Sequence, residues 1–293
     1  MDNEELKSVL KARLLRDVAY LCRRDDRHWS KPVVQMLREF RGSQTHAAFF
    51  GGTLRSLLVS RMQRRRLGRP RDIDIVVAGT TVESLKERFH ELVARETRFG
   101  GLQLRRMNWQ FDVWPLQQTW AFLQDDVSAP EFSLLPATTF LNLEAIAVDV
   151  WPSPGRARCI YSGDDQFFDG LLSRTLELNR EDNPYPSLCV VRSLVMSSAI
   201  DFAIGPRLAR YIAGVGPTIS SVELEAIQVK HYGKIRQRAD LLRRWIEHIV
   251  RSLEQCEKRI TLPLLRQKTF WPDLESDGPS QNVRIVGLPK GAR

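Results

Sequence analysis

A pair of glycines followed by two aspartates is the feature that most constrains the fold of this chain. Gly51-Gly52 come directly after the short apolar run His46–Phe50, and the leucines of Leu54–Leu58 recur at helical spacing. This order predicts a strand, a tight turn and a helix. The backbone N–H groups of the turn and of the helix N-terminus would then face one point, where they can bind phosphate oxygens.

The two aspartates begin a second apolar run, Asp72–Val77. In a strand, residues two apart point to the same face about 6.5–7 Å apart, so Asp72 and Asp74 are expected together, with Ile73 buried opposite them. Neighbouring carboxylates repel each other unless cations lie between them, and Mg²⁺ is commonly held by one or two carboxylates plus substrate phosphates. The aspartate pair therefore predicts metal-assisted phosphoryl or nucleotidyl transfer.

Each half of this signal also occurs in proteins without such a site. A glycine pair after an apolar strand is usually only a turn, and an Asp-x-Asp sequence is often only the solvated part of an edge strand. Here the two halves occur in the required order, and Arg55 lies just inside the expected helix. The combination favours a site for phosphate and metal.

Length and composition narrow the class of protein. At 293 residues the chain can bury more than one hydrophobic core. No apolar stretch approaches the roughly 20 residues that cross a bilayer, and the acidic start Met1–Glu5 differs from a signal peptide. The cysteines are dispersed without a CxxC pair, which is typical of a reduced compartment and argues against zinc. We expect a cytoplasmic protein with no membrane contact.

The net charge of +9 is unevenly distributed. Arginines crowd the segment between the glycines and the aspartates: Arg61, Arg64, Arg65, Arg66, Arg69 and Arg71. Such a run is often no more than a solvated face. Beside a proposed metal site, however, its first five members are expected to attract a polyphosphate or a nucleic-acid backbone.

The order of patterns predicts an α+β chain of four parts. We expect an N-terminal helical segment over 1–44, a head with a mixed sheet and flanking helices over 45–178, a helical neck-like domain over 179–272, and a disordered tail over 273–293. Within the head, Val82–Arg95 has the spacing of an amphipathic helix. Within the helical part, Val222–Arg259 forms one long amphipathic stretch.

These residues resemble the head and neck of the class II nucleotidyltransferases, the family of bacterial poly(A) polymerases and tRNA CCA-adding enzymes in the DNA polymerase β superfamily. The family's first motif is strand, Gly-Gly, two residues, Arg-Asp, helix and Asp-x-Asp. The chain supplies Gly51, Gly52, Arg55, Asp72 and Asp74. It departs from the motif at Ser56, where the family has Asp, and its segment leading to the aspartates is longer.

Other motifs of the family are partly kept. The superfamily often has a third carboxylate on a later strand, and Asp112 within Trp109–Val113 matches it. The second motif keeps its hydrophobicity but loses its charges in Thr138–Ala145, and the base-selecting Glu-Asp-x-x-Arg of the neck aligns with Tyr185–Cys189. Arg192 keeps its place in the following helix. The rule for choosing a base is therefore expected to be changed or relaxed.

The resemblance implies a polymerase-β-like fold and a Mg²⁺-dependent transfer of a nucleoside monophosphate from an NTP to a hydroxyl group. It assigns catalysis and two metal ions, Mg²⁺ or alternatively Mn²⁺, to Asp72, Asp74 and Asp112. It assigns nucleotide binding to Gly51, Gly52, Arg55, Ser56 and Arg192. An RNA 3′ end, such as that of a tRNA-like acceptor, is the best single guess for the acceptor, while a protein or small-molecule hydroxyl stays open.

Two other functions remain open at this stage. The lost charges of the second motif and the neck favour an inactive nucleotide- or RNA-binding protein with a regulatory or assembly role. A third option is a helical interaction module that dimerises through Val222–Leu253, with the head as its scaffold. The sequence names neither the NTP, nor the acceptor, nor the oligomeric state.

Overall fold

The structure is a computed structural model that describes residues 2–23, 30–40, 46–152, 155 and 157–263. Residues 1–262 form one compact unit, to which all the described residues but Pro263 belong. The expected disordered tail, 273–293, lies outside the described residues. Along the described parts of the chain, no helix is long and apolar enough to cross a membrane.

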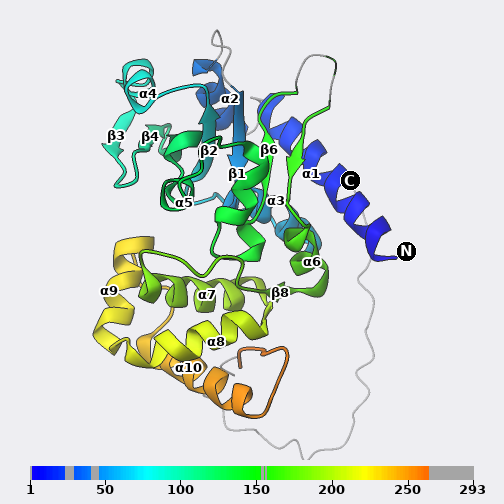
Figure 1. The fold of residues 1–293 in the computed structure, drawn as a ribbon, viewed down its shortest axis with the longest axis vertical. Coiled ribbons are helices and arrows are strands. Elements are labelled where there is room, and N and C mark those ends of the chain that lie inside the picture. The colour runs from blue at the N-terminus through cyan, green and yellow to red at the C-terminus, as the bar shows by residue number, and fades with distance from the viewer. Residues whose placement is uncertain (1, 24–29, 41–45, 153–154, 156, 264–293) are drawn as a thin grey trace, which may run out of the picture. The chain divides into compact units, whose positions relative to one another are not determined.

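The core of the first half is a seven-stranded mixed sheet (Figure 1). Its strands, in spatial order, are β3 (Val93–Glu96), β4 (Leu102–Arg106), β5 (Trp109–Pro115), β2 (Ile73–Ala78), β1 (His46–Phe50), β6 (Ala147–Asp149) and β7 (Ile160–Tyr161). Strands β2 and β5 are parallel, and the other neighbouring pairs are antiparallel. We call residues 46–178 the sheet region.

The two faces of the sheet are packed differently. One face, with Ile73 and Ile75 of β2, joins the main hydrophobic core together with residues of α1 (Asn3–Arg23), α2 (Ser30–Glu39), α3 (Gly52–Met62) and α4 (Val82–Arg88). The other face carries Val76 and Asp74, and a smaller cluster with η1 (Leu116–Gln118), α5 (Trp120–Gln124) and η2 (Phe132–Thr138) packs on it. Because side chains alternate along a strand, the aspartates point away from the main core.

Four helices dominate the residues that follow. They are α7 (Pro186–Ile200), α8 (Pro206–Val215), α9 (Ser221–Tyr232) and α10 (Ala239–Glu254), and we call residues 186–262 the helical region. The turn η3 (Asn142–Glu144), the helix α6 (Gln166–Ser173), the turn η4 (Gly216–Thr218) and the short parallel strands β8 (Thr175–Leu176) and β9 (Ala203–Ile204) complete the fold. The mixed sheet with flanking helices, followed by helices, confirms the predicted fold class.

The helix predicted over Val82–Arg95 is too long. Helix α4 ends at Arg88, and the chain then forms edge strand β3, which pairs with β4 across a register shift between Val93 and Arg95. Leu85 and Phe89 are buried as the helical spacing requires. Beyond them, Val93–Glu96 forms a strand rather than the predicted helix, because its backbone hydrogen-bonds to the edge of β4.

The long stretch Val222–Arg259 is two helices rather than one. Gly233 adopts φ +72° and ends α9, as glycine commonly does at a helix C-terminus. The buried side chain of Gln228 then holds the turn, since its Oε1 accepts from the N–H groups of Arg236 and Gln237, both at 2.9 Å. This turn between α9 and α10 projects into the pocket described below.

Most apolar residues of this stretch pack inside the helical region. Leu224, Leu242 and Ile249 are fully buried, whereas Val222 and Val229 are exposed. The stripe that suggested a dimerising module is therefore largely core.

Candidate active site

The glycine turn joins β1 to α3 in a conformation that suits glycine. Gly51 has φ 62° and ψ −119° and occupies the N-cap of α3, where no side chain satisfies the first helical N–H groups. Its own N–H donates to the carbonyl of Ile146 at 2.9 Å. The hydroxyl of Thr53 donates to the carbonyl of Asp72 at 3.3 Å, which fixes the start of β2 beside the helix N-terminus.

A pocket of about 650 Å³ opens beside this turn. Its walls come from both regions and bring together most of the residues predicted from sequence. From the sheet region come Gly51, Gly52, Arg55, Ser56, Arg71, Asp72, Asp74 and Glu144, and from the helical region come Arg192, His231, Tyr232 and Arg236. The pocket thus combines a glycine turn at a helix N-terminus, two carboxylates and several cations.

Asp74 and Asp112 lie directly opposite each other on the parallel strands β2 and β5. Burial, followed by the charges of Asp72 and Asp112, raises the pKa of Asp74 well above its usual value. Burial and the charge of Asp72 also raise the pKa of Asp112. The three carboxylates are therefore close enough to repel one another electrostatically.

Asp112 lies in an adjoining hollow rather than in the main pocket. This hollow shares Asp74 and Trp114 with the main pocket. The Oδ1 atom of Asp112 accepts hydrogen bonds from the side-chain amides of Gln103 and Gln110, each at 3.3 Å. Its role as a third metal ligand stays a prediction.

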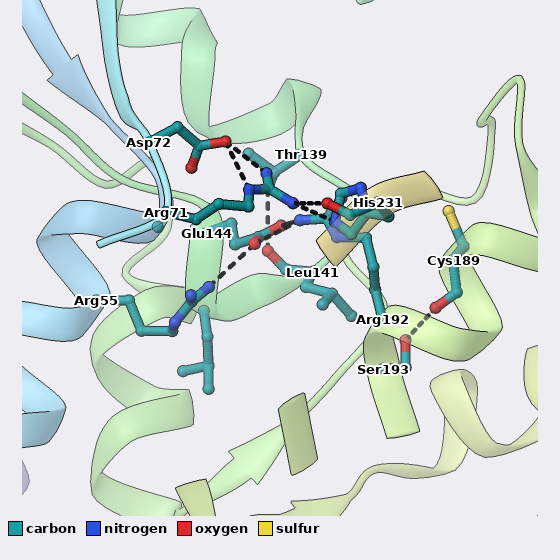
Figure 2. A network of polar contacts seen from close by, with 12 residues as sticks. Arg55, Arg71, Asp72, Thr139, Leu141, Glu144, Cys189, Arg192, Ser193 and His231 are labelled. Carbon is teal, nitrogen blue, oxygen red and sulfur yellow. Dashed lines mark hydrogen bonds and ion pairs between the residues drawn. The ribbon is translucent and has the colours of Figure 1, made fainter. Parts of the chain in front are cut away.

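Asp72 is engaged by its neighbour in sequence. Arg71 Nε and Nη2 lie 2.8 and 2.6 Å from Asp72 Oδ2. The Nη1 atom of the same guanidinium contacts Nε2 of His231 on α9 (Figure 2). Because Arg71 donates to that nitrogen, His231 accepts with a neutral ring; burial and the charges of Arg71 and Arg192 lower its pKa to about 3.

Carboxylate oxygens are ligands of the kind that divalent cations such as Mg²⁺ take. Across the described residues, no three His, Cys, Asp or Glu side chains form a group that could hold a metal ion. Within the same residues the carboxylate of Asp74 accepts no hydrogen bond, and burial together with the negative charges of Asp72 and Asp112 raises its pKa. Asp74 and Asp72 would hold the cation, and at Asp72 the Arg71 guanidinium already engages Oδ2.

Glu144 joins the two arginines predicted to bind the nucleotide. Its Oε1 accepts from Arg55 Nη1 at 3.0 Å and from Arg192 Nη2 at 2.7 Å, and its Oε2 lies 2.9 Å from Arg192 Nη2 (Figure 2). Burial alone would raise the pKa of Glu144, but the charges of Arg192 and Arg55 outweigh it and lower the pKa. Arg55 from α3 and Arg192 from α7 thus meet on one ionised carboxylate.

The arginine run and Ser56 are distributed over different surroundings. Arg61 pairs with Asp17 at 3.3 Å, and Arg69 lies 5.2 Å from the ring of Trp109. Arg65 and Arg66 line a second hollow of about 300 Å³, which shares Arg55 and Ser56 with the main pocket. Ser56 lines the pocket, but its hydroxyl donates to the carbonyl of Gly52 at 2.9 Å.

Sequence reasoning missed Glu144, Arg71, His231 and Tyr232 as pocket residues. His231 and Tyr232 enter the pocket because α9 ends directly after them, and Gly233 was the signal that could have located that end. Glu144 lies in the second-motif segment Thr138–Ala145, which sequence reasoning treated as having lost its charges, and only the folded chain brings it to Arg55 and Arg192.

Comparison with known proteins shows the fold. No family model and no curated protein matches this sequence. A solved CCA-adding enzyme in complex with CTP is 17% identical over 81% of this chain, with a TM-score of 0.51. The Thermotoga maritima CCA-adding enzyme complexed with tRNA is 16% identical over 81% of this chain, with a TM-score of 0.50. The chain spans 54% and 53% of these structures, so it shares their fold over about half their length.

Proposed function

We propose that this protein is a Mg²⁺-dependent nucleotidyltransferase that transfers a nucleoside monophosphate from an NTP to a hydroxyl acceptor. One observation carries the proposal: the glycine turn at the N-terminus of α3 and the carboxylates Asp72 and Asp74 line the same pocket. The turn supplies N–H groups for phosphate oxygens, and the carboxylates supply oxygen ligands for metal. The fold shared with CCA-adding enzymes supports the same chemistry.

Each side chain has a separate task in this proposal. Gly51 and Gly52 let the triphosphate approach the backbone, while Arg55 and Arg192 offset its charge. The hydroxyl of Ser56, turned away from the carbonyl of Gly52, donates to a phosphate oxygen. Asp72 and Asp74 hold Mg²⁺, with Asp112 as the third carboxylate and a candidate base for the acceptor hydroxyl. The bound ions supply positive charge to the reacting phosphate and the leaving pyrophosphate. The chain itself contributes mainly positioning and charge.

An RNA 3′ end is the proposed acceptor. The second hollow continues from the main pocket and carries Arg65 and Arg66, which suit a phosphate backbone. One structural neighbour was solved with tRNA, which supports the same kind of partner. A hydroxyl group of a protein or of a small molecule is the alternative, because no residue in the pocket requires a nucleic acid.

The domain boundaries and the compartment are part of the proposal. We place the head at 45–178 and the neck-like domain at 179–272, preceded by the helical segment 1–44. The four cysteines are free thiols, which supports a reduced, cytoplasmic setting.

The Arg71–Asp72 ion pair favours a second candidate function. If Arg71 never leaves Asp72, the pocket binds a nucleotide or RNA without catalysing transfer, and the protein acts as a regulatory or assembly partner. The two functions can be told apart, because nucleotidyl transfer requires Asp72 and Asp74 as metal ligands, whereas binding without transfer does not.

Incubation with each α-labelled NTP, total RNA and Mg²⁺ or Mn²⁺ tests the proposal. We expect label in RNA, or in protein if the acceptor is a protein hydroxyl, and we expect Asp72→Ala with Asp74→Ala to abolish it. An unlabelled outcome with all four NTPs and both ions, despite measurable nucleotide binding, would instead support the inactive binding protein.

A further inference from the structure

Glu144 lies where the sheet region meets the nucleotide pocket, and its position is fixed by the fold. It ends the turn η3, whose first residue, Asn142, is buried. Asn142 Oδ1 accepts from the N–H groups of Leu143 at 2.8 Å and of Glu177 at 2.9 Å. A Cβ placed on Gly51 would lie 3.7 Å from the Glu144 carbonyl oxygen, so the turn carrying Glu144 packs against the glycine turn.

The charges around Glu144 do not balance. Arg55 and Arg192 contribute two positive charges to one carboxylate, and the side chains are only 17%, 26% and 13% exposed for Arg55, Arg192 and Glu144. A partly buried cation without a counter-ion is costly. Within this group of three side chains, one positive charge is left over and can attract an anion.

The surplus charge adjoins the N-terminus of α3. A Cβ on Gly52 would lie 3.5 Å from Arg55 Nη2, so this nitrogen lies against the first turn of the helix. Contacts to Glu144 use Nη1 of Arg55 and Nη2 of Arg192. Unpaired helical N–H groups and a surplus guanidinium charge at one point make an anion site suited to phosphate groups.

We propose that Glu144 is a positioning residue that holds Arg55 and Arg192 together as a seat for the phosphate groups of the nucleotide. The seat draws one arginine from α3 and one from α7, so phosphate binding depends on both regions of the protein. The inference rests on the proposed function, because it assigns the seat to the phosphates of the NTP. Both arginines are charged with or without Glu144, so the role proposed for Glu144 is to set the positions of their guanidinium groups.

Binding of inorganic tripolyphosphate in EDTA tests this role without metal or base. Removing a negative charge beside an anion site would by itself strengthen anion binding. A positioning role predicts the opposite sign, because Glu144→Gln replaces the carboxylate by a neutral amide whose NH2 group, in place of Oε2, cannot accept from Arg192 Nη2. We expect tripolyphosphate affinity to fall by about tenfold in this variant, with AMP binding changed much less. The control Glu39→Gln removes another arginine-paired carboxylate, outside the pocket, and should change neither.

A double-mutant cycle separates positioning from general destabilisation. If Glu144 acts through Arg192, the loss caused by Glu144→Gln should shrink in the Arg192→Gln background. If Glu144→Gln does not fold, Glu144→Asp retains the charge, and its shorter side chain should still weaken tripolyphosphate binding. Unchanged or tighter binding in the folded variants, or strictly additive losses in the cycle, would overturn the inference.

The same measurements keep this inference apart from the proposed function. Glu144-dependent binding of tripolyphosphate in a protein that transfers no label would leave the seat standing and reject the transferase. Transfer of label in a protein whose tripolyphosphate binding does not depend on Glu144 would support the transferase and reject the role of Glu144.

Discussion

Arg71 engages one oxygen of the Asp72 carboxylate, with Nη2 of the arginine 2.6 Å from Oδ2 of the aspartate. The same guanidinium contacts His231 on α9, so a predicted metal ligand is tied to the helical region through one side chain. A metal ion at Asp72 would therefore lie beside an internal cation that already engages Oδ2 of this carboxylate.

Arg71→Gln should strengthen metal binding because it removes this competitor. The Arg71 side chain is 44% exposed, so the pair is worth at most about 1 kcal/mol, and Mn²⁺ affinity should rise by up to about fivefold. Electron paramagnetic resonance of free Mn²⁺ during a titration measures it. Arg69→Gln, whose arginine lies over Trp109, is the matched control. Equal Mn²⁺ affinity in the Arg71 variant and the wild type would show that Arg71 does not oppose the metal.

Asp112→Asn should stabilise the metal-free protein. The asparagine can still accept from Gln103 and Gln110, while the repulsion toward Asp74 and Asp72 disappears. We expect a gain on the order of 1 kcal/mol, or a few degrees in Tm, measured by thermal unfolding in EDTA. With saturating Mn²⁺ the wild type should gain more Tm than the variant. A lower Tm of the variant in EDTA would contradict the repulsion.

His231 should stay neutral far below the usual range of histidine. Its pKa is lowered to about 3 by burial and by the charges of Arg71 and Arg192. NMR of the ring protons, assigned with His231→Gln, should show no titration between about pH 8 and 5. Because the folded pKa lies below the unfolded one, His231 favours folding above about pH 6.5 and loses this contribution as the pH falls toward 3. A ring that titrates near pH 6.5 would show that Arg71 does not donate to it.

Gly51→Ala should destabilise the protein and weaken nucleotide binding together. At φ 62° and ψ −119° a Cβ is strained, at a cost of roughly 1–3 kcal/mol, whatever space surrounds it. Urea unfolding measures the loss. Gly68→Ala is a suitable control, since its added Cβ meets nothing within 4 Å and no positive φ is involved. Equal stability of the two variants would mean that the turn has another conformation.

Local patterns predicted the part of the site that local sequence builds. The glycine turn depends on residues that follow β1 directly, and the alternation of β2 alone places Asp74 opposite Ile73. Parallel pairing of β2 with β5 then puts Asp112 beside Asp74, which the resemblance anticipated.

The remaining features of the fold and of the site depend on tertiary contacts that local patterns do not reveal. Edge pairing with β4 overrode helical spacing at Val93, and Gly233 ended a helix that the apolar spacing alone continued. Glu144 meets Arg192 across 48 positions of sequence, a contact that no local pattern encodes.

The most direct test of nucleotidyl transfer follows both ends of one NTP. With α-labelled NTP the label should appear in the acceptor, and with γ-labelled NTP an equal amount should appear as pyrophosphate. Asp74→Asn should abolish both signals while leaving tripolyphosphate binding in EDTA at least as strong, because Asp74 pairs with none of the arginines that the structure describes and its negative charge is lost. Release of orthophosphate in place of pyrophosphate, or undiminished transfer in the Asp74 variant, would contradict the account.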